Sequence, residues 1–538
     1  MHQALSPESR GASFDMDRLP LFGRVFVPVP TGPEATAFDE HAIQTMQVPE
    51  PVLMENAGRS AALVLHRLFP RGRVVVLAGG GNNGGDGVVL ARTLRAAGRD
   101  VRLVGVGRSG SQTLLHGHGP SPEALPDDAS RLDAVLAWGD VLVDGLLGTG
   151  ITGAARAPFD RVIQAVNRSG RPVLALDIPS GVEAGSGACR GEAVSAQVTV
   201  AFGAPKLGSL LHPGRERSGR LVAVEIGFPP WSEDAAGARL ITPGWVDELR
   251  PRRAFRTHKN AEGRLLLLAG RPGMAGAAVL SARAALRAGV GFVRVASSAE
   301  NRAILQMAVP EAVFVDMDDA EAVRLAAESS DALTAGPGLG TDASAARCLN
   351  WILEEMAPPA LLLDADALTL LGEGRLAAFP GASAPDRRLL TPHPGELARI
   401  VEGEAGQAIS DPGSAARAAA GRWEAACLLK GSPSVVAISG GGPLRVSPTS
   451  TSDLARAGMG DVLTGVAGAF LARGLRAPDA ATVALHLTGR AAAMATCGGE
   501  ALLPSDVVNA LPMALEERGE GSTELDFPFV LLDLGPPR

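Results

Sequence analysis

The residues with the clearest chemical potential lie near the C-terminus, in the run AGMGDVLTG at residues 457–465. Two glycines precede Asp461, and apolar residues at helical intervals follow it, which predicts a glycine-rich turn that leads into a helix. Such a turn directs backbone N–H groups and the positive end of the helix dipole at a bound phosphate. A carboxylate beside that anion fits only as a base that takes a proton from an attacking hydroxyl. The pattern predicts phosphoryl transfer; a simple helix cap is the alternative for the motif alone.

Further chemistry-bearing residues end several predicted strands of the second half. The segment 430–432 offers an ammonium group, a glycine and a hydroxyl, and the glycines of 336–340 permit close approach of a ligand to the backbone. His393 can bond to a ligand or serve as an ordinary loop residue. Asp364 and Asp366 can lie near Mg²⁺ or substrate, or cap the next helix. Because they end successive strands of one predicted sheet, we expect them to meet at one site.

Three polar loops follow predicted strands of the first half. The run NNGGDG at 82–87 opens a helix, and two more loops begin at Asp144 and Asp177. The first is not a GxGxxG dinucleotide fingerprint, because side-chain amides replace part of the bare backbone. Amide and carboxylate oxygens suit a monovalent cation, and amide N–H groups suit phosphate. The loops are predicted to converge on one crevice, the alternative being ordinary turns with helix-capping acids.

The composition of the chain excludes several kinds of partner and site. The chain has 538 residues, 46% of them hydrophobic, and a net charge of -8, which argues against a nucleic-acid or anionic-membrane partner. The four cysteines show no CxxC spacing, so neither a zinc site nor a disulfide framework is predicted, and a cytoplasmic location fits best. Lysine occurs only at positions 206, 259 and 430. A chain that otherwise uses arginine keeps lysine where a compact point charge is needed, or keeps it by chance.

The elements that must position these residues alternate between strands and helices in both halves. This alternation predicts the α/β class, with two doubly wound domains and seven or eight strands in the first sheet. No apolar run approaches the length of a membrane span, and the N-terminus lacks the apolar region of an export signal. The predicted divisions are a leader at 1–30, a first domain at 31–235, a linker at 236–250, a second domain at 251–519 and a tail at 520–538. The tail is either a flexible end or a docked strand.

The motifs of the second half, HKN, GRLLLLAG, GPGLG, DADAL, TPHPGE, LLKG and AGMGDVLTG, resemble the ribokinase-like dehydratase domain of the NAD(P)H-hydrate repair enzymes over residues 245–515. The resemblance implies that ADP or ATP, with Mg²⁺, phosphorylates the C6 hydroxyl of a hydrated nicotinamide cofactor, and that loss of phosphate restores NAD(P)H. Asp461 would be the base on that hydroxyl. The segment SPTSTSDLAR at 447–456 departs from the family pattern. The implied nucleotide contacts are Lys430, Gly431, Ser432, Pro433, Ser434 and Gly460, and the implied cofactor contacts are Ala277, Gly338, His393 and Asp461.

The first half, with NNGGD, DGLLGTG, DIPSG, LMENAG and AFGAPKLGSLLHPG, resembles the Rossmann-like NAD(P)H-hydrate epimerase domain over residues 31–235. The resemblance implies exchange of the R and S epimers of hydrated NADH and NADPH (NADHX and NADPHX), with K⁺ bound by Asn83, Asp144 and Ser180. Asp177 would be the acid/base residue, with Lys206 as an alternative. The implied substrate contacts are Asn82, Asn83, Gly84, Gly85, Asp86, Gly148, Thr149, Gly150, Ile151, Thr152, Gly153, Ala154 and Asp177.

Two other functions remain as alternatives from the sequence. The second domain could be a kinase of a vitamin precursor or small alcohol, and the first could be a non-catalytic binding scaffold. Three intact ligand loops in the first domain favour the fused repair enzyme, because a scaffold needs none of them. A homo-oligomer with small-molecule partners only, and no nucleic acid or membrane partner, is expected. The choice between ADP and ATP, and between NADHX and NADPHX, stays open.

Overall fold

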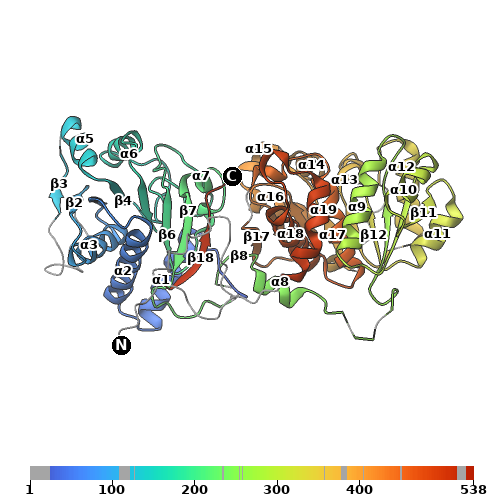
Figure 1. Cartoon of the computed structure of the whole chain (residues 1–538), viewed down its shortest axis with the longest axis horizontal. Helices are drawn as coiled ribbons and strands as arrows, with labels where there is room; N and C mark the ends of the chain where they lie inside the picture. Colours follow the sequence, from blue (N-terminus) through green and yellow to red (C-terminus); the bar gives the residue numbers. More distant parts are fainter. Residues whose placement is uncertain are drawn as a thin grey trace, which may run out of the picture.

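The computed structural model shows two α/β lobes side by side along the long axis of the molecule (Figure 1). It describes residues 25–107, 122–126, 128–232, 235–253, 255–256, 258–356, 358–376, 384–403, 405–448, 451–517 and 529–537. Most of the predicted leader, part of the predicted tail and residues 449–450 of the atypical segment lie outside these ranges. Every helix of the described part is too short or too polar to cross a bilayer.

The first lobe is built on an eight-stranded sheet with the order β18-β7-β6-β5-β4-β1-β2-β3, which agrees with the expected seven or eight strands. All neighbours are parallel except β18 and β7. The strands are β1 (Val74–Ala78), β2 (Val101–Gly105), β3 (Glu123–Ala124), β4 (Val141–Gly145), β5 (Val173–Leu176), β6 (Val198–Phe202), β7 (Arg220–Val224) and β18 (Val530–Leu534). The helices are α1 (Gly32–Glu40), α2 (Glu50–Leu68), α3 (Asn82–Ala96), α5 (Ala129–Trp138), α6 (Phe159–Arg168) and α7 (Gly214–Ser218).

Helices cover both faces of this sheet because its strands are apolar on both faces. In β1, Val74 and Val76 pack with residues of α2 and α3, whereas Val75 and Leu77 pack with residues of α5 and α6. Successive strand residues point to opposite faces, so an unbroken apolar run such as VVVLA requires cover on each side. The run therefore specifies a doubly wound sheet.

The second lobe has a ten-stranded sheet with the order β11-β10-β9-β12-β13-β14-β15-β16-β17-β8. In this spatial order, all neighbouring strands from β11 through β10, β9, β12, β13 and β14 to β15 are parallel, and β16 is antiparallel to both of its neighbours. The strands are β8 (Ala238–Leu240), β9 (Arg264–Leu268), β10 (Phe292–Ser297), β11 (Val313–Asp316), β12 (Ala332–Ala335), β13 (Leu361–Leu363), β14 (Arg388–Leu390), β15 (Ala426–Leu429), β16 (Val435–Ala437) and β17 (Leu444–Val446).

Here too, alternate residues of the central strand face different helix layers. Leu265 and Leu267 of β9 pack with α8 (Pro243–Leu249), α9 (Ala275–Arg287), α10 (Arg302–Ala308), α17 (Met459–Ala472), α18 (Ala477–Met494) and α19 (Pro504–Glu516). Leu266 and Leu268 belong to the core that includes α11 (Ala320–Glu328), α12 (Ala343–Trp351), α13 (Ala365–Gly372), α14 (Pro394–Val401), α15 (Ala405–Ser410) and α16 (Pro412–Arg422). Two doubly wound α/β domains are thus confirmed.

Both ends of the chain add to a sheet edge. Val29 N–H donates to the Ala238 carbonyl at 3.0 Å, and Leu240 N–H donates to the Val27 carbonyl at 2.9 Å, so residues of the predicted leader lie along β8. β8 itself pairs with β17 of the second sheet. The segment 236–250, expected to be a linker without periodicity, therefore carries a strand and α8. A three-residue strand is too short to show a periodic pattern in the sequence.

The predicted tail ends in a docked strand, which was one of the two alternatives. β18 runs antiparallel to β7 of the first sheet, although it follows the whole second domain in sequence (Figure 1). The buried Arg220 guanidinium donates to Asp533 Oδ1 at 2.7 Å, and a second bond joins the same two side chains. Leu221 of β7, Leu532 of β18 and Leu444 of the second domain share one hydrophobic core. The two lobes are therefore joined by continuous apolar packing.

Candidate active sites

The glycine-rich turn near the C-terminus leads into a helix, as predicted. α17 begins at Met459 after Gly458, whose φ of 91° favours glycine. A Cβ at Gly458 would lie 2.9 Å from Leu280 Cδ1, so the turn also lacks room for a side chain. Asp461 stands in the first turn of α17. Its backbone carbonyl accepts a bond from Ser281 Oγ of α9 at 3.0 Å, which ties the two helices together.

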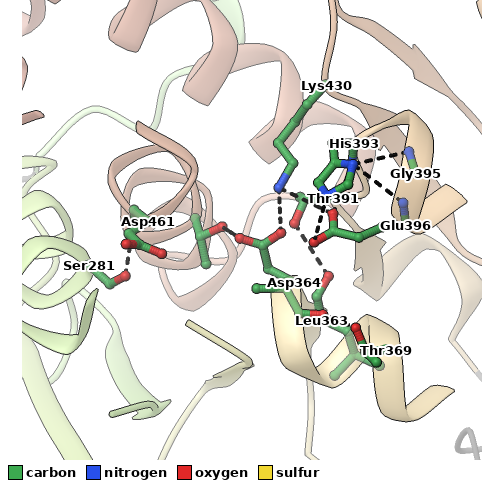
Figure 2. Close-up of polar contacts among 12 residues, drawn as sticks. Ser281, Leu363, Asp364, Thr369, Thr391, His393, Gly395, Glu396, Lys430 and Asp461 are labelled. Atoms are coloured by element: carbon green, nitrogen blue, oxygen red, sulfur yellow. Dashed lines mark hydrogen bonds and ion pairs between the residues drawn. The ribbon is translucent and has the colours of Figure 1, made fainter. Parts of the chain in front are cut away.

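A buried ion pair lies beside this turn (Figure 2). Lys430 Nζ donates to Asp364 Oδ1 at 2.7 Å, and Thr464 Oγ1 donates to Asp364 Oδ2 at 2.6 Å. Both carboxylate oxygens of Asp364 are thus engaged, and its side chain does not cap α13. Burial alone would lower the pKa of Lys430, but Asp364 and Glu396 raise it above its ordinary value. The site therefore keeps a positive charge that can meet a phosphate.

Asp461 is near that pair without being part of it. In the described part of the chain, no side-chain hydrogen bond or ion pair reaches its carboxylate. Burial raises the pKa of Asp461 to about 7, the charge of Asp364 adds to the effect, and the charge of Lys430 opposes it. A carboxylate that titrates close to neutral pH is well matched to general-base catalysis.

These residues line a cavity of about 1030 Å³. The backbone of Gly460 lies directly beside the ammonium group, because a Cβ there would be in ordinary contact with Lys430 Nζ at 3.5 Å. The loop after β15 is held by a bond from Gly431 N–H to Ser434 Oγ at 3.2 Å. Of the residues implied by the resemblance, the lining includes Lys430, Gly431, Ser432, Ser434, Gly460, Asp461 and His393; Pro433, Ala277 and Gly338 are not part of it.

His393 caps a helix and also lines the cavity of the second site. It is the N-cap of α14, where its Nδ1 accepts bonds from Gly395 N–H at 3.0 Å and Glu396 N–H at 3.4 Å. Because Nδ1 is an acceptor, Nε2 carries the proton, and it lies 3.4 Å from Glu396 Oε1. The half-exposed ring also lines the cavity. His393 can therefore donate a hydrogen bond to a ligand while it caps the helix.

The glycines of 336–340 bring loops together at the ends of the strands. Gly338 has a φ of 55°, and a Cβ there would lie 3.1 Å from Ala277 Cβ, so these two predicted contact residues pack against each other. Gly340 N–H donates to Asp366 Oδ2 at 2.7 Å. Asp366 thereby fixes this loop, and its charge adds to the rise in the pKa of Asp461.

In the first lobe, the three predicted cation ligands come from three strand ends. Ser180 N–H and Oγ donate to the two oxygens of the buried Asp144 at 2.8 and 2.6 Å. Burial raises the pKa of Asp144 to about 6 against the effect of these bonds. Asn83 Nδ2 donates to the Leu147 carbonyl at 3.0 Å, whereas the buried Asn83 Oδ1 has no hydrogen-bond partner among the residues that the structure describes. A buried oxygen without a partner is available to a donor group, a water molecule or a cation.

A second cavity, of about 770 Å³, opens beside these loops. Asp177, with a φ of 63°, accepts a bond from Phe202 N–H at 3.0 Å and another from the Lys206 ammonium group. The buried Lys206 also donates to the Phe202 carbonyl at 3.0 Å. Asp39 and Asp86 line the same cavity. Burial raises the pKa of Asp39 to about 6 and that of Asp86 well above its ordinary value, and Asp177 adds to both effects.

The predicted substrate contacts divide between this cavity and the packing around it. Gly84 and Gly85 pack instead: a Cβ at Gly84 would lie 2.0 Å from the Gly79 carbonyl oxygen, and one at Gly85 would lie 2.7 Å from the Met54 side chain. The lining includes Asn82, Asn83, Asp86, Gly148, Thr149, Gly150 and Asp177, but not Ile151, Thr152, Gly153 or Ala154. Sequence reasoning missed Asp39, Phe159, Phe228 and Trp231, which no local motif marks, and it gave no role to Phe202 of the motif AFGAPKLGSLLHPG.

Comparison with known proteins connects the two sites. A family model described as NAD(P)H-hydrate dehydratase matches residues 265–512, and one described as YjeF-related protein N-terminus matches residues 50–208. The bifunctional NAD(P)H-hydrate repair enzyme of Moorella thermoacetica is 34% identical over 518 residues, which cover 91% of this chain and 97% of that protein. The enzyme of the same name from Salinibacter ruber is 36% identical, with 92% and 97% covered.

Among solved structures, the ADP/ATP-dependent NAD(P)H-hydrate dehydratase from Bacillus subtilis, co-crystallized with ATP and Mg²⁺, is 27% identical to this chain. It aligns with 52% of this chain and 97% of its own, at a TM-score of 0.46. The full-length relatives decide the assignment, because they match both lobes in one chain. The chain belongs to the family of bifunctional NAD(P)H-hydrate repair enzymes.

Proposed function

We propose that the first domain exchanges the R and S epimers of NADHX and NADPHX, and that the second domain uses ADP or ATP to convert the S epimer to NADH or NADPH. One observation carries the proposal for the second domain. Asp461, with a pKa of about 7, lines a cavity beside a charged Lys430 and the backbone of Gly460. A base, a cation and bare N–H groups in one cavity are what phosphoryl transfer to a hydroxyl requires.

The chemistry at the second site follows from these positions. Lys430 and the N–H groups at the start of α17 hold the phosphates, and Asp461 takes the proton from the C6 hydroxyl as its oxygen attacks the terminal phosphoryl group. The C6–O bond then breaks, with the ring nitrogen supplying electrons, and loss of the proton at C5 forms the C5=C6 bond. Hydroxide is a poor leaving group and phosphate a good one. Phosphorylation therefore makes the dehydration possible.

Mg²⁺ would enter this site with the nucleotide. In the described part of the chain, no group of three or more His, Cys, Asp and Glu side chains can hold a metal ion by itself. This fits Mg²⁺, which commonly binds through substrate phosphates and one or two carboxylates. Asp364 lines the cavity, whereas Asp366 does not, so Asp364 is the carboxylate that would hold it, and Asp461 stays available as the base. The ion would neutralise charge on the transferred phosphoryl group.

At the first site, K⁺ would be held by Asn83, Asp144 and Ser180. The unpartnered Asn83 Oδ1 supports this proposal, because a buried oxygen without a donor is costly unless it meets a cation. Asp177 is the proposed acid/base residue at C6, and the Lys206 ammonium group bonded to it orients the carboxylate. Lys206 stays the alternative for the proton transfer itself.

The two activities belong together for a stereochemical reason. Hydration of the nicotinamide ring without an enzyme gives both C6 epimers, whereas a chiral cavity with a single base accepts only one of them. An epimerase in the same chain lets the whole damaged pool be repaired. A homo-oligomer and a cytoplasmic location stay predictions, of which sedimentation of the purified chain checks the first.

The test uses a mixture of the two epimers with the purified chain and either ADP or ATP. We expect the near-ultraviolet absorbance of the reduced nicotinamide ring to appear, and both epimers to be consumed. Consumption of one epimer only would remove the epimerase from the proposal. A phosphoester that accumulates without reduced cofactor would favour the kinase alternative. Comparing the two nucleotides decides which is the phosphate donor.

A further inference from the structure

The cavity of the second site is not built by the second domain alone. His212 and Glu216 of the first domain, and Pro537 of the C-terminal segment, lie on its wall together with Lys430, Gly460 and Asp461. His212 lies two residues before the start of α7. The motif LLHPG that contains it belongs to the first domain. The nucleotide cavity is therefore composite.

A specific polar contact joins the two domains in this wall. His212 Nε2 lies 3.3 Å from Ser432 Oγ, in the loop that starts with Lys430. On the other side of the ring, His212 Nδ1 lies 3.1 Å from Glu216 Oε1. A carboxylate accepts only, so Nδ1 carries a proton and Nε2 is directed at Ser432. The ring is thus oriented from one domain onto the phosphate loop of the other.

The segment that carries His212 is firmly packed. The buried Arg215 donates to the Gly219 carbonyl at 2.6 Å and also bonds to the Gly535 carbonyl of the C-terminal segment. A Cβ at Gly214 would lie only 2.2 Å from the Gly208 carbonyl oxygen, so the backbone on either side of the ring is in close contact. His212 itself is 27% exposed. Its place in the wall is set by the fold of the first domain.

We propose that His212 is a positioning residue for the nucleoside di- or triphosphate of the second site, supplied by the first domain. This inference rests on the proposed function, in which the 430–434 loop holds the nucleotide phosphates. The contact with His212 holds the Ser432 side chain in one orientation in the cavity. A hydroxyl that is already fixed loses less conformational freedom when a phosphate binds, so it contributes more to affinity.

The test compares His212→Ala, His212→Asn and His212→Gln in the full chain. The side-chain amide of glutamine reaches as far as Nε2, and its oxygen can accept a bond from Ser432 Oγ, whereas the amide of asparagine does not reach that far. We expect alanine and asparagine to raise the nucleotide KM about threefold to tenfold, the effect of one hydrogen bond, with kcat and the KM for hydrated cofactor unchanged. Glutamine should restore the nucleotide KM. His66→Ala, at an exposed position of α2, is the matched control and should leave all three constants unchanged.

Two results would overturn the inference. One is a nucleotide KM that stays unchanged in both His212→Ala and His212→Asn. The other is an equal loss in all three variants together with a lower melting temperature, which would mean that His212 only stabilises the domain interface. A double change of His212→Ala with Ser432→Ala should raise the nucleotide KM by less than the product of the single effects, because both remove the same contact.

Direct binding separates this inference from the proposed function. Titration calorimetry with ADP and Mg²⁺, or ATP and Mg²⁺, needs no hydrated cofactor. Failure of the unaltered chain to bind either nucleotide would refute the proposed function itself. Binding by the unaltered chain with the same Kd in the alanine and asparagine variants would refute only the role of His212.

Discussion

The two sites both place a lysine beside aspartates, but they pair them differently. In the first site, Lys206 bonds directly to Asp177, the residue that the sequence predicts to act in catalysis. In the second site, Lys430 bonds to Asp364 instead, and Asp461 is left outside the pair. The lysine thus binds the proposed proton-transfer residue in one site and a separate counter-ion in the other.

This difference shows how a buried acid is made into a base. A direct bond from an ammonium group favours the charged carboxylate, whereas burial without such a bond favours the neutral form. Asp461 experiences burial and the charge of Asp364, so its pKa rises to about 7. In the first cavity the acid with a comparable environment is Asp39, whose pKa is raised to about 6 by burial. The four predictions below test this contrast, from the largest expected effect to the smallest.

Asp461→Asn should lower the rate of dehydration roughly a thousandfold, because a positioned general base contributes about 10²- to 10⁴-fold. Epimer exchange should continue at its normal rate, since Asp461 lies in the other domain. The absorbance of the reduced cofactor measures the first activity, and proton NMR of the two epimers measures the second. Loss of both activities together would contradict the separation of the two sites.

Asp177→Asn should slow epimer exchange about a hundredfold through loss of proton transfer. Its bond from Phe202 N–H can survive in asparagine, so the loop should keep its shape. With dehydration running, the S epimer should be consumed and the R epimer should persist beyond its spontaneous exchange. Asp39→Asn is the comparison. If epimer exchange is slower in Asp39→Asn than in Asp177→Asn, Asp39 is the residue that transfers the proton. The pair of Asp177 with Lys206 would then not be the catalytic pair.

Asp533→Ala should destabilise both sites at once, because β18 of the C-terminal segment completes the first sheet. It leaves the buried Arg220 guanidinium without its carboxylate, which costs roughly 3 kcal/mol of unfolding free energy. Both activities should then be lost at the same lower temperature in thermal inactivation. Glu321→Ala breaks the exposed pair with Arg324 and is the matched control, with little change expected. Separate inactivation temperatures for the two activities would mean that the lobes unfold independently.

Local patterns in the sequence were sufficient for the two doubly wound domains, and they pointed to several of the residues that line the cavities. The run VVVLA fixes a strand that is buried on both faces, and two glycines before Asp461 fix the turn and the helix start. These features depend on residues close together in sequence, which is why they can be predicted. The roles proposed for the site residues stay predictions until the variants are measured.

Contacts between segments far apart in the chain could not be predicted from the sequence. No pattern shows that Lys430 pairs with Asp364 rather than Asp461, since that depends on distances between two strand ends and the start of α17. The same holds for Asp39 in the first cavity, for β18 beside β7, and for His212 in the wall of the second cavity. Each arises from tertiary contacts between segments that are far apart in the chain, so neither spacing nor periodicity records it.

The smallest effect, a shift in a pH profile, tests the contrast most directly. The basic form of Asp461 is the active one, so kcat/KM for dehydration should rise with pH and level off above the pKa of about 7. Asp364→Asn removes a negative charge that helps to raise this pKa, and it removes the main counter-ion of Lys430, whose charge favours the Asp461 carboxylate. Both changes move the midpoint to lower pH. Asp366→Asn removes a weaker influence and should move it in the same direction by less. A midpoint that stays in place in both variants, or moves to higher pH, would mean that a different group controls the profile and that Asp461 is not the base.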